Sequence, residues 1–262
     1  MNIFDCIIFN NEEMILDLRL NYLNKFVKKF IIVESKYTHQ GTLKNKLLNL
    51  ENFKKYQHKI DYHLIDEFPD NLSNWGRENF QRNYILNAIT NLDDNDFIMV
   101  SDLDEIPNLN NFKNIKNLKY TVFNQSNYSY KFNLKNITYP NWLGTRMCKK
   151  KHLKSPQWLR DQKVKKYSFL KFYKIRWNII GSGGWHFSYM MKPHEISRKI
   201  QSFGHAEYNL ERYTNVKTIE EKISKGVDLF EREQYYKKVK LDNTFPKIIF
   251  ENKDYFKEWI LD

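Results

Sequence analysis

The sequence predicts an α/β fold in which a mostly parallel sheet is flanked by helices and followed by a helical C-terminal section. Three observations support this prediction. Short apolar runs alternate with amphipathic segments in the first half, a pattern typical of strands joined by crossover helices. After Pro107 the pattern changes to aromatic, alternating segments. From residue 208 onward, charged helical segments dominate.

The individual elements follow from periodicity. Apolar runs with the length of buried strands occur at residues 3–9, 30–33 and 97–100, and residues 60–65 also have the pattern of a strand. Apolar residues at helical spacing predict helices over 12–23 and 75–90. Further along, we expect strands over 120–134 and 168–175, and a helix over 193–203 with Pro193 near its first turn.

Composition excludes several classes of protein. The chain has 262 residues, of which 41% are hydrophobic and 16% aromatic, so a folded core is expected rather than disorder. Cys6 and Cys148 are too few for a disulfide framework. No window approaches the ~20 apolar residues that a membrane-spanning helix needs. The N-terminus does not resemble a signal peptide, so we expect a soluble, cytoplasmic protein.

The positive charge is concentrated in one window. The net charge is +12, and residues 146–176 hold twelve lysines and arginines against one acid, Asp161, which gives +11. A local basic patch favours an anionic partner. The alternative is a solvated, lysine-rich loop, and the sequence leaves both open.

The strongest chemical motif is FIMVSDLDEIP at residues 97–107. Asp102 and Asp104 follow a buried strand at its carboxyl end, the edge where open α/β sheets bind ligands. In extended geometry their side chains point the same way. Two neighbouring carboxylates repel unless a cation lies near them, and Mg²⁺ or Mn²⁺ prefers such oxygen ligands. The alternative is a solvated acidic turn.

A second motif, GSGGWHFSYM at residues 181–190, places His186 after three glycines. Imidazole is a common metal ligand, so His186 is a candidate third ligand beside Asp102 and Asp104. Glycine weakens a strand unless something approaches closely, which favours a site over a purely structural histidine. We therefore expect His186 to face the same cleft as the two aspartates.

Polar residues near the same edge are candidates for binding an anionic ligand. Arg77 and Arg82 lie on the helix that leads into the Asp102 strand, and arginine binds phosphate through its planar fork. Glu34 ends an earlier strand and could bind a ribose or base edge. The alternatives are surface ion pairs and a loop cap.

Together these segments resemble glycosyltransferase family 17, whose members include β-1,4-mannosyl-glycoprotein β-1,4-N-acetylglucosaminyltransferases. The similarity runs in order from about residue 4 to about residue 207, through DCIIFNNE, VESKYTHQG, WGRENFQRN, SDLDEIP, GGWHFSY and SFGHAE. It implies a GT-A-like nucleotide-binding sheet, a UDP-sugar donor carrying GlcNAc, Mn²⁺ or Mg²⁺, a glycan acceptor and inversion at the anomeric carbon. It also adds Asn10 to the donor-binding candidates.

The resemblance suggests how a single domain, 1–262, is divided. Residues 1–107 would form the nucleotide-sugar-binding half, 108–207 the acceptor-side half and 208–262 the helical C-terminal section. The membrane anchor of the animal enzymes is lacking, so we expect a different acceptor, such as a lipid-linked oligosaccharide. Residues 146–176 could then contact the inner face of a membrane at ~1 kcal/mol per basic residue.

The expected reaction is direct displacement, with a general base taking the proton of the acceptor hydroxyl. Glu195, Asp161 and Glu105 are all candidates for this base, and Glu195 is favoured. Two alternative functions are a haloacid-dehalogenase-like phosphatase, which also uses D-x-D, and a protein that binds single-stranded nucleic acid. The first places its motif differently, and the second leaves the D-x-D strand unexplained, so no nucleic acid is expected.

Overall fold

A computed structural model describes residues 1–112, 118–165, 168, 171, 174–202 and 205–261. Within these residues the strands are β1 (Ile3–Ile8), β2 (Lys29–Ser35), β3 (Ile60–Ile65), β4 (Phe97–Ser101), β5 (Glu105–Pro107), β6 (Tyr120–Ser129), β7 (Leu134–Asn136), β8 (Asn141–Lys149), β9 (Asn178–Ile180), β10 (Gly184–Ser188) and β11 (Tyr236–Lys238). They form one mixed sheet with the main order β11-β7-β6-β8-β4-β1-β2-β3.

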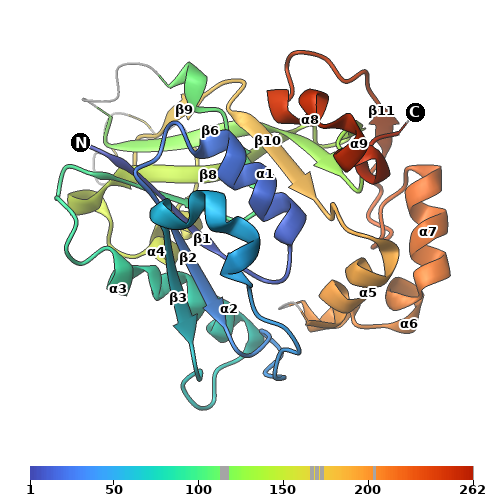
Figure 1. Ribbon diagram of the computed structural model, residues 1–262, viewed down its shortest axis with the longest axis horizontal. Helices are drawn as coiled ribbons and strands as arrows, with labels where there is room; N and C mark the ends of the chain where they lie inside the picture. The colour runs from blue at the N-terminus through green and yellow to red at the C-terminus, as the bar shows by residue number, and fades with distance from the viewer. Residues whose placement is uncertain (113–117, 166–167, 169–170, 172–173, 203–204, 262) are drawn as a thin grey trace.

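The α-helices are α1 (Glu13–Leu23), α2 (Asn74–Asn83), α3 (Ile85–Ala88), α4 (Pro156–Asp161), α5 (Pro193–Ser202), α6 (Glu211–Thr214), α7 (Val216–Lys225), α8 (Lys247–Glu251) and α9 (Lys253–Phe256). Short 3₁₀ segments are η1 (Leu50–Lys59), η2 (Leu109–Asn111), η4 (Lys150–His152), η5 (Ala206–Tyr208) and η6 (Lys257–Trp259). Figure 1 shows the C-terminal helices gathered at one end of the sheet.

The first half of the chain forms the parallel part of the sheet. β1 pairs in parallel with β2 and β4, and β2 pairs in parallel with β3. The chain runs from β1 outward to β3 and then returns to the other side of β1 as β4, so the direction of winding reverses between β1 and β4. Such a switch point, at the carboxyl ends of the strands, is where open α/β sheets bind ligands.

The second half makes the sheet mixed, so the expectation of a mostly parallel sheet was too strong. β8 lies antiparallel to both β4 and β6, and β7 and β11 add further antiparallel pairs. Parallel pairing returns where β9 and β10 lie beside β6. Hydrophobic alternation marked this region as strands but carries no information on strand direction.

Most predicted elements are confirmed within one or two residues at their ends. The predicted helix over 75–90 is divided into α2 and α3. The predicted strand over 120–134 ends as β6 at Ser129. Residues 168 and 171, and 174 and 175, lie outside any strand, and the rest of the strand predicted over 168–175 lies outside the described residues. The C-terminal section contains β11 as well as helices, which the charge pattern did not predict.

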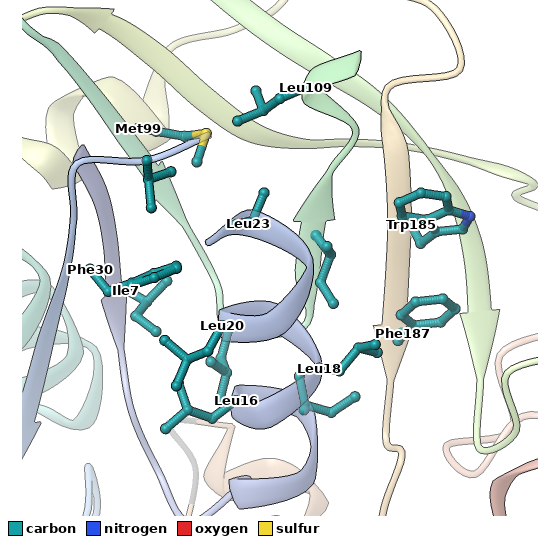
Figure 2. Close-up of a cluster of buried hydrophobic side chains, with 14 of the residues drawn as sticks. Ile7, Leu16, Leu18, Leu20, Leu23, Phe30, Met99, Leu109, Trp185 and Phe187 are labelled. Atoms are coloured by element: carbon teal, nitrogen blue, oxygen red, sulfur yellow. The ribbon is translucent and has the colours of Figure 1, made fainter. Parts of the chain in front are cut away.

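The main core lies between α1 and one face of the sheet. Leu16, Leu20 and Leu23 of α1 are fully buried and belong to the same apolar cluster as Ile7, Phe30 and Met99 of the strands. Figure 2 shows α1 between these strand residues and the rings of Trp185 and Phe187 on β10. On the opposite face, α3 and α4 cover Cys6, Ile98 and Val100 through Ile85 and Leu159. No helix among the described residues is long and apolar enough to cross a membrane.

Candidate functional site

The turn after β4 is held in place by a buried arginine. Arg19 of α1 pairs with Asp5 of β1, with Nη2–Oδ1 and Nε–Oδ2 distances of 2.6 and 2.7 Å, and both side chains have zero exposure. Its Nη1 donates to the carbonyl oxygens of Glu105 at 2.7 Å, Leu103 at 3.2 Å and Asp102 at 3.3 Å. The polar residue that interrupts the first apolar run thus fixes, through Arg19, the backbone that carries Asp102 and Asp104.

Asp102 accepts hydrogen bonds from two arginines. Arg82 Nη2 lies 3.0 Å from Oδ1, and Arg160 Nη2 lies 2.7 Å from Oδ2. The side chain is 38% exposed. Burial alone would raise the pKa of Asp102, but the guanidinium groups of Arg160 and Arg82 outweigh it and hold the pKa well below its usual range. Asp102 is therefore a charged anchor whose two oxygens are already engaged.

The helices that carry these arginines start at well-formed caps. Ser73 accepts from the Gly76 amide at the start of α2. Ser155 accepts from the Trp158 amide at the start of α4, and proline follows at the first position of that helix. The two helices also pack together, since the Gln157 amide donates to Asn83 Oδ1 at 3.0 Å. Sequence-local capping thus positions both guanidinium groups over Asp102.

The buried carboxylate of Glu105 joins several residues of the site by hydrogen bonds. It is fully buried, and Arg160 Nη1 donates to its Oε2 at 2.7 Å, while Trp142 Nε1 donates to its Oε1 at 2.7 Å. The Asp102 amide also donates to Oε2, at 3.1 Å. These bonds engage both oxygens, which leaves Glu105 badly placed to take a proton from an incoming hydroxyl.

Asp104 lies beside His186. The Asp104 Oδ2–His186 Nε2 distance is 3.6 Å, and the side chains are 13% and 12% exposed. His186 Nδ1 lies 3.0 Å from Asn127 Oδ1, and its ring stacks on Trp142 with centroids 4.5 Å apart. Burial opposes charge on both partners, but their mutual attraction dominates: the pKa of Asp104 is lowered and the pKa of His186 is raised.

Close strand packing brings His186 to this position. β10 runs antiparallel to β5, with His186 opposite Glu105. A Cβ on Gly184 would lie 2.1 Å from the Ile106 carbonyl oxygen, and its φ is +125°. Only glycine suits both conditions. The glycines that marked this motif therefore serve strand-to-strand approach, and that approach sets His186 next to Asp104.

A second charged pair lies close to Asp104. Lys199 Nζ of α5 contacts Glu12 Oε1, just before α1, at 2.6 Å, and both side chains are mostly buried. Burial and the negative charge of Asp104 raise the pKa of Glu12 although Lys199 lowers it. The charge of Glu12, followed by that of Asp104, keeps the pKa of Lys199 above its usual value despite burial. Lys199 thus adds a cation to the same edge of the sheet.

The remaining predicted residues form no hydrogen bond that links them directly to Asp102, Asp104 or His186 in the described part of the chain. Glu195 is exposed, and its carboxylate accepts from the Lys192 amide at the start of α5. Asp161 is exposed on α4 and accepts from Gln157. Arg77 donates to the His39 carbonyl. Glu34 has zero exposure and accepts from Lys44, Tyr62 and the Leu48 amide. Asn10 is half-buried at the carboxyl end of β1.

A three-ligand metal site at Asp102, Asp104 and His186 is not present in the described part of the chain, where no group of three or more His, Cys, Asp or Glu side chains is arranged to hold a metal ion. The reason is that both oxygens of Asp102 are bonded to arginine. Asp104 and His186 remain as a neighbouring carboxylate and imidazole. This pair fits a divalent ion that takes its other ligands from a substrate's phosphates, as Mg²⁺ commonly does.

The basic window contributes to the interior as well as the surface. Arg160 bonds Asp102 and Glu105. Arg146 Nη1 donates to the carbonyls of Leu159 and Arg160, and Lys150 Nζ donates to those of Thr90 and Leu92. Several of the basic residues that give this window its +11 charge therefore bond groups within the protein. The basic surface patch is smaller than the number of lysines and arginines in the window suggests.

Four residues of the site were not among the sequence candidates: Glu12, Trp142, Arg160 and Lys199. Glu12 could have been found, because it follows β1 and so must lie near the switch point. The other three reach the site only through tertiary contacts. Arg160 in particular was counted as one of many basic residues in its window.

The carboxylates and cations of this cluster lie at the switch point of an α/β sheet, the edge where such sheets bind ligands. Comparison with known proteins identifies the class. Glycosyltransferase family 17 matches residues 1–239, so the chain belongs to this family. That assignment favours the glycosyltransferase interpretation over the phosphatase and nucleic-acid alternatives.

Curated relatives share a shorter segment. A β-1,4-mannosyl-glycoprotein 4-β-N-acetylglucosaminyltransferase of Rattus norvegicus is 27% identical over 115 residues, covering 40% of this chain and 21% of the rat protein. The Homo sapiens protein of the same name is also 27% identical over 115 residues, covering 40% of this chain and 22% of its own length. The matched segment thus spans about a fifth of these relatives.

Proposed function

We propose that this protein transfers a sugar, GlcNAc by analogy with its relatives, from a UDP-sugar to a glycan acceptor with inversion. One observation carries the proposal: Asp102 and Asp104 stand at the β1/β4 switch point, surrounded by Arg82, Arg160 and Lys199. This arrangement suits a diphosphate that gains negative charge as it leaves. The sugar and the nucleotide are inferred from the family.

The residues have distinct roles in this proposal. Asp104 and His186 would hold Mn²⁺ or Mg²⁺, which when bound neutralises charge on the diphosphate. Asp102 keeps the guanidinium groups of Arg82 and Arg160 at the edge of the sheet. Lys199 adds positive charge from α5. Removing water from around such fixed charges strengthens their effect on the leaving group.

The proposed reaction forms one bond and breaks one bond at the anomeric carbon of the donor sugar. The acceptor hydroxyl oxygen forms a bond to the anomeric carbon, the bond from that carbon to the UDP oxygen breaks, and a general base takes the hydroxyl proton. Glu195 and Asp161 remain proposals for the base. Each is exposed and hydrogen-bonded close to its own helix, so it would have to approach the cleft when an acceptor binds.

The donor is tested by thermal unfolding with UDP, GDP or CMP, each with Mn²⁺ or with EDTA. We expect UDP with Mn²⁺ to raise the melting temperature most, because a ligand at a hundredfold excess over its dissociation constant stabilises the native state by ~2.7 kcal/mol. UDP in EDTA should raise it less. Stabilisation by GDP or CMP but not UDP would contradict the assigned donor.

The acceptor is proposed to be a glycan, including a lipid-linked one. Basic residues of 146–165 that are exposed, such as Lys151, Lys154 and Lys163, could contact anionic headgroups. Sedimentation with vesicles containing anionic lipid tests this contact. Retention should fall with added salt, since exposed charges are screened within about 10 Å at 0.1 M. Equal retention on neutral vesicles would contradict it.

A further inference from the structure

A polar pocket opens beside the Asp104–His186 pair on the side of β6, β8 and β10. Its volume is about 280 Å³, and His186 and Trp142 form part of its wall. His186 thus borders both the proposed donor edge and the pocket. That size is near the lower end for small-ligand sites, ~300 Å³, and suits one sugar ring.

The side chains of the pocket wall are polar or aromatic. Its described residues carry amides, hydroxyls, aromatic rings, the His186 imidazole and the Arg232 guanidinium, and none of these residues has a carboxylate or a wholly aliphatic side chain. Amides and hydroxyls both donate and accept, as the hydroxyls of a sugar require. Aromatic rings supply flat apolar faces for the C–H face of a sugar. Tyr139 is 60% exposed and Trp142 40% exposed, so both rings are accessible.

The pocket carries little net charge to attract an acid. Arg232 is the one arginine or lysine among the described residues of the wall, and it is paired with Asp228 by two bonds, Nη2–Oδ1 at 2.7 Å and Nε–Oδ2 at 3.0 Å. Asp228 is only 2% exposed, whereas Arg232 is 47% exposed, so the carboxylate that balances the guanidinium lies beneath it. The guanidinium is therefore compensated locally, and the wall favours an uncharged ligand.

We propose that this pocket binds a neutral sugar unit of the glycan acceptor. The inference rests on the proposed function. The pocket is built by the second half of the chain, whereas the proposed donor edge lies at the carboxyl ends of β1 and β4. A sugar bound between Tyr139, Trp142 and Gln234 would lie next to His186, which is the side from which an acceptor must approach the metal-bound donor.

Two exposed tyrosines provide a matched test. Tyr139 lines the pocket and Tyr235, 59% exposed, does not. The probes are N,N′-diacetylchitobiose and β-1,4-mannobiose, with a uronic-acid disaccharide as the charged comparison, measured by saturation-transfer NMR. We expect wild type to bind the neutral probes, and Tyr139→Ala and Gln234→Ala to weaken binding about tenfold, as loss of one aromatic contact allows. Tyr235→Ala should bind like wild type.

The outcomes separate this inference from the proposed function. No saturable binding of neutral probes, equal losses in Tyr139→Ala and Tyr235→Ala, or preference for the uronic acid would overturn the inference. Displacement of the probes by UDP-GlcNAc but not by UDP would show that the pocket holds the donor's sugar, which also overturns it. The proposed function fails separately, if UDP does not stabilise the wild-type protein in Mn²⁺.

Discussion

At the scale of single residues, the two aspartates of the D-x-D motif have different surroundings. Asp102 is neutralised by two guanidinium groups, whereas Asp104 faces an imidazole and lies near Lys199. From the sequence alone, both aspartates are expected to have the same surroundings, because side chains two residues apart on a strand share a face. In the structure they lie in a turn, where that rule no longer holds. Asp104 is therefore the better placed of the two to bind a cation.

Asp104→Asn should reduce transfer by at least about a hundredfold, comparable to removing a preorganised charge at a reacting centre. The fold should remain, since asparagine has nearly the same shape as aspartate and the ion pair that is lost joins Asp104 to His186 alone among the described residues. Asp102→Asn should also reduce transfer, but with a lower melting temperature, because it leaves Arg82 and Arg160 without their shared partner. Turnover and thermal unfolding are measured together. Asp94→Asn, at a 72% exposed carboxylate that also pairs with a lysine, is the control.

His39 should make stability depend on pH. It is buried against Gln81, with Nε2–Oε1 at 2.8 Å, and burial lowers its pKa, helped by Lys44 and Arg82 and opposed by Glu78. The unfolded chain, with a pKa near ~6.5, then takes up the proton first. The contribution of neutral His39 to the free energy of unfolding is complete above the pKa of the unfolded chain. It is lost as the pH falls toward the lower pKa of His39 in the folded protein.

His39→Gln should remove this loss of stability at low pH while keeping a side chain that forms hydrogen bonds. Melting temperatures of wild type and variant are compared between roughly pH 7.5 and 5.5, a range that spans the ordinary pKa of histidine. Wild type should lose stability relative to the variant as the pH falls. Parallel pH profiles for the two proteins would show that His39 does not carry the effect.

At the scale of elements, one ion pair joins β1, α1 and the turn after β4. Arg19 bonds Asp5 on one side and three carbonyl oxygens on the other, so the turn after β4 depends on how α1 packs against the sheet. Sequence patterning predicts α1 and β1 through their apolar residues. It does not reveal that Arg19 faces inward, since an arginine on an amphipathic helix is usually on the solvent side.

Arg19→Ala should destabilise the protein by ~3–5 kcal/mol, because it leaves Asp5 buried and unpaired. The double variant Asp5→Leu with Arg19→Met should recover much of that loss, as buried ion pairs replaced by apolar residues often do. Urea unfolding measures both. UDP binding by the double variant should remain weaker than that of wild type. The carbonyl oxygens of the turn have lost their donor, Arg19 Nη1. Full recovery of UDP binding would show that Arg19 does not position the turn.

At the scale of the whole molecule, the sequence predicted most elements but not the direction and pairing of the strands in the second half of the sheet. Strands 3–8, 29–35 and 97–101 were recognisable because each contains a short apolar run. The neighbours that complete the site, such as Arg160 and Trp142, depend on β8 lying beside β4. That pairing joins segments about fifty residues apart, and local patterns do not encode it.

The C-terminal segment belongs to the main core of the molecule. Phe245, Ile249 and Phe256 are buried in the same cluster as α1 and β10, although the family match ends at residue 239. Backbone bonds support this packing, since the Phe132 amide donates to the Trp259 carbonyl at 2.7 Å and Trp185 Nε1 donates to the Thr244 carbonyl at 3.1 Å. This segment therefore supports the strand that carries His186.

Phe256→Ala should destabilise the protein by ~3–5 kcal/mol, the usual cost of removing a buried phenylalanine ring. Its ring packs edge-on against Phe132, with centroids 5.4 Å apart, and Phe132 packs in turn against Phe187 of β10. The neighbouring Tyr255 is 57% exposed, so Tyr255→Ala should change stability by no more than ~0.5 kcal/mol. Urea unfolding compares the two. Similar small losses for both variants would mean that the segment is an appendage rather than part of the core, and β10 would then owe its position to β5 and β6 alone.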